Sequence, residues 1–226
     1  MVTAIFPAAG QSRRMQSVSN KNFLMLDGQP ILNRTLQVFS SIEEITDFII
    51  AASTDEISYI EQLISTVEKP CKIVEGGSER QYSIANALNV LPDSTEIVLV
   101  HDAARPLISV ETINAVIESA RSFGGAIAAV PAKNTIKVVD GDLFVESTPP
   151  RSKLVEVQTP QGFRRDILLK AYTQAERDGF LGTDDSSLVE RLGVRVKVVV
   201  SDYRNIKITT PEDLSIAEAL LGRRTQ

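Results

Sequence analysis

Cysteine, histidine and tryptophan are almost missing from this sequence: its 226 residues include one cysteine, one histidine and no tryptophan. Because Cys71 has no second cysteine to pair with, an internal disulfide is excluded, as is usual in a reducing compartment. Long apolar runs are missing too: none approaches the roughly 20 residues that span a bilayer, and no signal-peptide pattern is visible. We therefore expect a cytoplasmic protein with no membrane partner.

An excess of positive charge is also missing. The chain has 24 Lys and Arg residues against 29 Asp and Glu residues, a net charge of -5, so we expect no nucleic-acid partner. A small phosphate ligand needs only a local cluster of Lys and Arg, which an acidic protein can build. Because 43% of the residues are hydrophobic, the chain can bury one sizeable core, and we expect a single domain over residues 1–226.

Short β-branched runs alternate with helical patterns along most of the chain. The strands expected from these runs are Val2–Phe6, Phe48–Ala52, Lys72–Val74, Glu96–Val100, Gly125–Val130 and Val194–Val200. The expected helices are Pro30–Ser41, Ser53–Val67, Ser78–Leu91, Ser109–Phe123, Arg164–Arg177, Thr183–Leu192 and Pro211–Leu221. Ser53 and Glu56 have the spacing of a helix capping box. The alternation predicts an α/β fold with a mostly parallel, Rossmann-like sheet flanked by helices on both faces.

A different pattern interrupts this alternation after Val130. Thr135–Val139, the turn Asp140-Gly141 and Leu143–Glu146 predict a β-hairpin, and Val155–Gln158 continues as a strand. The hairpin, within residues 132–154, is either a plain surface hairpin or an arm that packs on a partner subunit.

Ligands of open parallel sheets bind beyond the carboxyl ends of the strands, so the segments that follow the strands are the candidate sites. The first is Pro7–Gly10, whose small residues let a backbone approach phosphate oxygens, with Arg14 and Lys21 supplying positive charge. It matches neither a dinucleotide fingerprint nor a P-loop, so a plain turn with solvated arginines is the alternative. The second contains the pair Gly76-Gly77, which either admits a ring or phosphate or is an ordinary turn.

The third segment is His101–Pro106, after the fourth strand. Asp102 there can hold Mg²⁺ or a sugar hydroxyl, and Arg105 can clamp a phosphate. Lys207, in an apolar stretch, needs a partner such as a phosphate unless it lies on a solvated edge strand. The pair Asp184-Asp185 resembles a metal site, but helix N-capping explains it more simply.

These segments, taken in order, resemble the 2-C-methyl-D-erythritol 4-phosphate cytidylyltransferase family, which has the fold of the nucleotide-diphospho-sugar transferases. The motifs that carry the resemblance are Pro7-Ala8-Ala9-Gly10 with Arg14 and Lys21, His101–Pro106, Gln158–Gln161, Thr183–Asp185, and Asn205–Thr209 followed by Pro211-Glu212-Asp213. The resemblance covers nearly the whole chain. It implies an enzyme that joins CTP and a methylerythritol phosphate with release of pyrophosphate.

The resemblance also implies a role for each matching residue. Arg14 and Lys21 stabilise the transition state. The nucleotide is bound by Pro7, Ala8, Ala9, Gly10, Gly77, Ser83, Asp102 and Ala103, with Asp102 also beside Mg²⁺. The polyol phosphate is bound by Arg105, Thr135, Arg151, Thr159 and Lys207. In the family the arm reaches into the neighbouring subunit, which implies a homodimer with shared sites.

Three positions depart from the family's pattern: Asn20 stands where proline is common, which implies a looser loop, and Ser12 and Ser78 replace other small or acidic residues. Because the attacking group is a phosphate monoester with a second pKa of about 6, no general base is required and His101 is assigned to the scaffold. Three alternatives stay open: a ribitol 5-phosphate cytidylyltransferase, an enzyme for another nucleotide or sugar phosphate, and a nucleotide-sensing module without catalysis.

Overall fold

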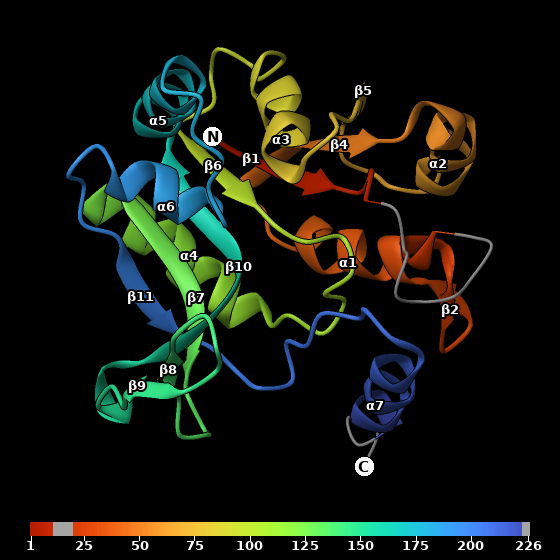
Figure 1. The fold of residues 1–226 in the computed structure, drawn as a ribbon. Helices are drawn as coiled ribbons and strands as arrows, with labels where there is room; N and C mark the ends of the chain where they lie inside the picture. The colour runs from red at the N-terminus through yellow and green to blue at the C-terminus, as the bar shows by residue number, and fades with distance from the viewer. Residues whose placement is uncertain (11–19, 223–226) are drawn as a thin grey trace.

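Seven strands form the central sheet of the computed structural model, which describes residues 1–10 and 20–222, in the order β11-β7-β10-β6-β1-β4-β5 (Figure 1). They are β1 (Val2–Pro7), β4 (Ile45–Ala52), β5 (Cys71–Glu75), β6 (Ile97–Val100), β7 (Gly125–Pro131), β10 (Val155–Arg164) and β11 (Lys197–Val200). Only β10 runs antiparallel to its neighbours β6 and β7. The mostly parallel sheet is therefore confirmed, while β10 extends well beyond the expected Val155–Gln158.

Helices cover both faces of the sheet (Figure 1). One face carries α1 (Ile31–Ser40), α2 (Ile57–Ile64) and α4 (Val110–Phe123), and the other carries α3 (Arg80–Leu88), α5 (Arg165–Arg177) and α6 (Asp185–Glu190). The alternation within β1 explains the two layers: Ala4 and Phe6 point into the first core and Ile5 into the second. A last helix, α7 (Pro211–Gly222), packs against the short pair β2 (Met25–Leu26) and β3 (Gln29–Pro30). Of the helices within the described ranges, none combines the length and the apolar character needed to cross a membrane.

The two ends of α4 show how the local sequence sets the helix limits. The Ser109 hydroxyl accepts a hydrogen bond from the Thr112 N–H at 3.2 Å, and Gly124 ends the helix with a φ of +90°. The capping box expected at Ser53 is wrong. Its hydroxyl donates instead to the Ala9 carbonyl at 3.1 Å, and the chain first forms a 3₁₀ turn, η3 (Thr54–Glu56). Ser53 thereby ties the end of β4 to the loop after β1.

The predicted hairpin is present as an arm below the sheet in Figure 1, formed by β8 (Val138–Val139) and β9 (Val145–Ser147). A hydrogen bond of 3.1 Å from the Ala132 N–H to the Leu154 carbonyl closes its base. The tip differs from the expected Asp140-Gly141 turn, because Leu143 takes the positive φ of 66° and the Asp140 carboxylate accepts two backbone N–H bonds.

Candidate active site

A cavity of about 940 Å³ opens at the carboxyl ends of the strands on the β1 side of the sheet. This is the place where an open α/β sheet binds its ligand. The predicted site residues that line the cavity are Pro7, Ala9, Gly10, Lys21, Gly77, Ser83, Asp102, Ala103 and Lys207. The structure therefore brings together most of the residues expected at a nucleotide site, from four separate segments of the chain.

Two asparagines that follow the undescribed residues 11–19 are hydrogen-bonded to Ala8, directly after β1. The Asn20 side chain donates to the Ala8 carbonyl at 3.0 Å and to the Glu56 carboxylate at 2.9 Å, and Asn22 donates to the same carbonyl at 3.2 Å. Asn20 also accepts from the Asn22 N–H, which caps the 3₁₀ turn η2 (Lys21–Phe23). Lys21 thus follows a side chain that is hydrogen-bonded on three sides, so hydrogen bonds anchor the position where the family commonly has proline. Ala8 is buried, and Arg14 lies outside the described residues.

The Gly76-Gly77 pair is required by close packing. A Cβ atom on Gly76 would lie 2.2 Å from the Ala9 Cβ, and one on Gly77 would lie 2.4 Å from the Tyr82 Cβ. The Gly77 N–H donates to the Ser83 hydroxyl at 3.0 Å, which orients that hydroxyl at the start of α3. Gly76 thus lets the segment after β5 approach Ala9 after β1, and Gly77 lets the same segment turn closely against Tyr82 at the start of α3.

Asp102 lies at the centre of a cluster of cations. Its carboxylate is 2.9 Å from Lys207 Nζ, 3.3 Å from Arg105 Nε and 3.6 Å from Arg80 Nε. Burial disfavours the charge, but Lys207, Arg80 and Arg105 outweigh burial and hold the pKa of Asp102 far below its usual range. Asp102 is therefore the charged partner that the sequence predicts for Lys207. Arg105 does not line the cavity: it lies behind Asp102 and donates to the Asn205 carbonyl at 2.7 Å.

The only histidine is fully buried beside this cluster, and its hydrogen bonds define its tautomer. His101 Nε2 donates to the Arg105 carbonyl at 3.2 Å, so Nδ1 is the acceptor for the Thr159 hydroxyl at 3.1 Å. The Thr159 hydroxyl in turn accepts from the Asp102 N–H at 3.0 Å. Burial lowers the pKa of His101 to about 3, so the ring is neutral and serves to hold the segment from Asp102 to Arg105. Thr159 belongs to this buried chain and does not line the cavity.

A divalent cation has limited support from protein groups here. Asp102 is a predicted site carboxylate on the cavity wall, and within residues 1–10 and 20–222 no three His, Cys, Asp or Glu side chains gather as a metal site. Mg²⁺ commonly uses one or two carboxylates and completes its shell with water and substrate phosphates. The residues therefore fit a metal ion that binds together with a nucleotide and do not form a preformed all-protein cage.

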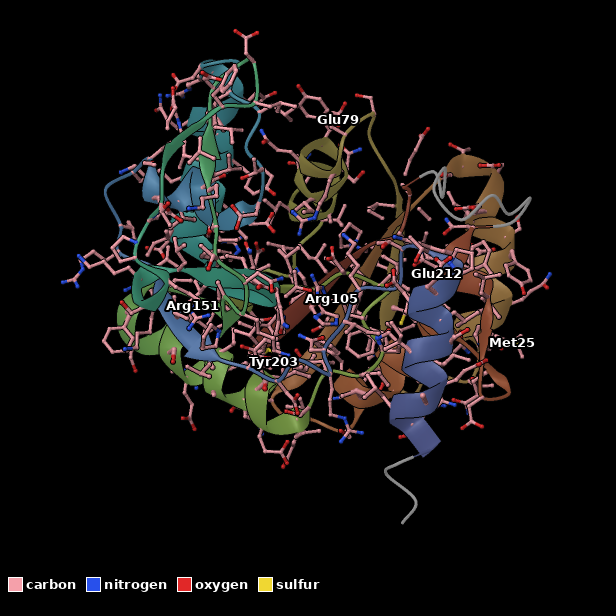
Figure 2. All side chains as sticks on the ribbon, turned by 60° about the horizontal axis from the view of Figure 1, so that its bottom comes forward. Met25, Glu79, Arg105, Arg151, Tyr203 and Glu212 are labelled. Atoms are coloured by element: carbon pink, nitrogen blue, oxygen red, sulfur yellow. The ribbon has the colours of Figure 1, made fainter. Side chains whose placement is uncertain are left out.

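Two expected residues lie away from the cavity. Thr135 and Arg151 belong to the segment of the arm, and Arg151 Nη1 donates to the Lys133 carbonyl at 3.0 Å. Figure 2 shows Arg105 near the middle of the molecule and Arg151 to one side of it. Within one chain, the structure does not bring Arg151 or Thr135 into the cavity.

Arg80 was missed by the sequence analysis although it lines the cavity and contacts Asp102. The signal was its place directly after Gly76-Gly77-Ser78-Glu79, as the first residue of α3. Of the acidic pair near α6, Asp184 is the expected N-cap, since its carboxylate accepts from the Ser187 N–H at 3.0 Å. Its neighbour Asp185 does something else, because it contacts Arg80 at 2.8 Å.

Comparison with known proteins gives a consistent result. The sequence model of the family described as 2-C-methyl-D-erythritol 4-phosphate cytidylyltransferase matches residues 2–223. A protein of that name from Caldanaerobacter subterraneus subsp. tengcongensis is 46% identical over 225 residues, covering 98% of this chain and 99% of its own. One from Geobacillus thermodenitrificans is 48% identical over 223 residues, covering 98% and 97%. The crystal structure of a 4-diphosphocytidyl-2C-methyl-D-erythritol synthase from Anaerococcus prevotii is similar with a TM-score of 0.88 at 33% identity, covering 98% of this chain and 96% of that one.

Proposed function

The chain belongs to the 2-C-methyl-D-erythritol 4-phosphate cytidylyltransferase family, and we infer that it joins CTP and 2-C-methyl-D-erythritol 4-phosphate to give 4-CDP-2-C-methyl-D-erythritol and pyrophosphate. It is a nucleotidyltransferase of the non-mevalonate route to isoprenoids. The observation that carries this function is the cavity in which a glycine-lined wall meets Lys21, Lys207 and Asp102. The names of the relatives do not favour ribitol 5-phosphate as the acceptor.

The reaction is an in-line attack of the substrate phosphate oxygen on the α-phosphorus of CTP, with pyrophosphate leaving. The nucleophile is already largely ionised at neutral pH, so it needs no base, and the neutral His101 behind the cavity fits that requirement. The obstacle is repulsion between two anions. Catalysis then consists of holding the groups in line and neutralising charge on the α-phosphate and the leaving group.

The nucleotide half of the site is formed by the backbone around Pro7, Ala9 and Gly10, together with Gly77 and Ser83. Lys21, on the cavity wall, and Arg14 neutralise the triphosphate and stabilise the transition state. Asp102 would hold Mg²⁺ together with the nucleotide phosphates, and the ion would supply further charge neutralisation. In support of this, Asp102 is ionised and lines the cavity.

The polyol phosphate half depends on a second copy of the chain. Lys207 lies in the cavity and Arg105 and Thr159 lie directly behind Asp102, whereas Thr135 and Arg151 are on the arm. The arm also presents apolar side chains to solvent: Leu143 is 80% exposed, Phe144 71% and Val145 58%. Such a patch is typical of a surface covered by a partner. We propose a homodimer in which the arm of one subunit supplies Arg151 and Thr135 to the other, and an enzyme that acts in the cytoplasm.

Pyrophosphate release tests the activity. The purified protein is given CTP and Mg²⁺ with either 2-C-methyl-D-erythritol 4-phosphate or ribitol 5-phosphate, and ATP, GTP and UTP replace CTP in parallel reactions. We expect release only with CTP and the methylerythritol phosphate. Release with ribitol 5-phosphate or with another nucleotide, and none with the expected pair, would overturn the assignment.

Sedimentation tests the shared site. Phe144→Asp introduces a charge on the arm and is expected to convert the dimer to a monomer with little turnover, while the protein stays folded. Phe123→Asp is the matched control, since Phe123 is also exposed, at 58%, but lies at the end of α4. A wild-type monomer with full activity would contradict the dimer, as would equal effects of the two substitutions.

A further inference from the structure

Arg80, the first residue of α3, lies between Asp102 on the cavity wall and the buried carboxylate of Asp185, the first residue of α6. Its Nη2 atom lies 2.8 Å from Asp185 Oδ2, and its Nε atom lies 3.6 Å from Asp102 Oδ1. The distance to Asp185 is that of a strong charge-assisted hydrogen bond, and the distance to Asp102 is too long for one. The guanidinium is thus held by Asp185 and only approaches Asp102.

Asp185 is buried beside the Arg80 guanidinium that it holds. Its side chain has no exposed surface, and its other oxygen accepts a hydrogen bond of 2.5 Å from the Tyr172 hydroxyl on α5. Burying a charged carboxylate without partners is strongly unfavourable, so Arg80 and Tyr172 are what allow its charge there. Burial, and to a smaller extent the negative charge of Asp185, raises the pKa of Tyr172 well above its usual value. The phenol therefore stays protonated and donates its hydrogen bond.

The segment before α6 is held against α3 by a second residue. Gln81 accepts from the Gly182 N–H at 2.9 Å and donates to the Phe180 carbonyl at 3.0 Å. The two elements that carry Arg80 and Asp185 are therefore locked together through backbone contacts as well as through the ion pair. This makes Asp185 a fixed anchor for the guanidinium.

The cluster around Asp102 contains more cations than carboxylates. It contains three cations, Arg80, Arg105 and Lys207, and two carboxylates, Asp102 and Asp185, which leaves one excess positive charge. No described residue accepts a hydrogen bond from Arg80 Nη1, and Arg80 lines the cavity. Its Nη1 N–H groups can therefore reach an oxygen of an anionic ligand.

We propose that Arg80 is a nucleotide-binding residue and that Asp185, with Tyr172, is a positioning residue that holds Arg80 away from full pairing with Asp102. This inference rests on the proposed function for the identity of the nucleotide. Without the Asp185 charge, the guanidinium would turn to the nearest carboxylate, Asp102. That movement would remove both the Arg80 donors and the Asp102 oxygens from the ligand.

Calorimetric titration with CTP and Mg²⁺ alone tests the proposal independently of turnover. We expect Asp185→Asn to weaken CTP binding about tenfold, the scale of a lost hydrogen bond to a charged group. In an Arg80→Ala background the same substitution should change affinity less than twofold, since it acts through Arg80. Equal effects in both backgrounds, or an unchanged affinity in a folded Asp185→Asn protein, would overturn it.

A matched control and a milder variant complete the test. Asp178→Asn removes an acidic partner in the same region, because Asp178 pairs with Arg191 at 2.7 Å, but it has no link to the cavity and should leave CTP affinity unchanged.

If Asp185→Asn does not fold, Tyr172→Phe removes one bond to Asp185 and keeps the ion pair. It should weaken CTP binding by about twofold to threefold, and only when Arg80 is present. No loss in Tyr172→Phe would then count against the proposal. If CTP binds as expected but no pyrophosphate is released by the wild type, the proposed function fails and this inference stands.

Discussion

Replacing His101 by asparagine should make the free energy of unfolding of this protein less dependent on pH below pH 6.5. The ring is fully buried, donates to the Arg105 carbonyl and packs against Phe39 with ring centroids 4.7 Å apart. Burial lowers the pKa of His101 from 6.5 to about 3 in the folded state. Below pH 6.5 the unfolded chain therefore takes up a proton that the folded chain refuses. Stability falls as pH falls through this range, and the contribution of His101 to the slope fades as pH rises above 6.5.

The magnitude follows from at most one proton. A full proton changes the free energy of unfolding by about 1.4 kcal/mol per pH unit, but the unfolded histidine is only half protonated at pH 6.5. Lowering the pH from 6.5 to 5 therefore costs about 1.6 kcal/mol. His101 is the only histidine in the chain, so no other imidazole adds to this slope. Asp102 changes the pH dependence of stability only below its ordinary pKa of 3.8. Its lowered pKa in the folded state contributes stability that is lost only at more acidic pH. Glu56, with a raised pKa, has a slope of opposite sign that both proteins share and that cancels in the difference.

Urea denaturation followed by circular dichroism from pH 5 to pH 7 measures the effect. Asparagine keeps an acceptor for the Thr159 hydroxyl, so the variant should fold, with lower stability at pH 7 because the bond to the Arg105 carbonyl is lost. The difference in stability between wild type and variant should shrink by about 1.6 kcal/mol between pH 6.5 and pH 5. A constant difference over that range would refute the reasoning, because it would mean that His101 is protonated in the folded protein.

Three further substitutions test the walls of the cavity and the arm. Gly76→Ala should lower the free energy of unfolding by about 1–3 kcal/mol in urea denaturation, since the new methyl group meets the Ala9 Cβ, whereas Gly141→Ala, with nothing within 4 Å, should change it little. Lys21→Ala should reduce kcat by roughly a hundredfold to a thousandfold in a folded protein, by analogy with the loss of a transition-state donor; near-normal turnover would rule out its role. Arg151→Ala should chiefly raise the KM for the polyol phosphate in steady-state assays, and an unchanged KM would speak against a shared site.

Several elements were predictable because their signals are local. A β-branched run makes β1, and a serine followed by an apolar stripe and a glycine makes α4, since cap and strand preferences act over a few residues. The extent of β10 was not predictable, because it is set by pairing with β6 and β7 from distant parts of the chain. Ser53 shows the same limit: its spacing suits a cap, but the Ala9 carbonyl across the cavity wall takes its hydroxyl.

The sequence by itself determined the fold class, the family and the segments that form the site, because the motifs follow the strand ends in a parallel sheet and the sheet brings those ends together. Only the tertiary structure decided which polar groups pair within that site. It placed the Asn20 side chain on the Ala8 carbonyl, Thr159 in the hydrogen-bond chain under Asp102, and Asp185 opposite Arg80. The physical reason is that pairing among buried charges depends on distances of about 3 Å between residues far apart in the chain, which no local spacing encodes.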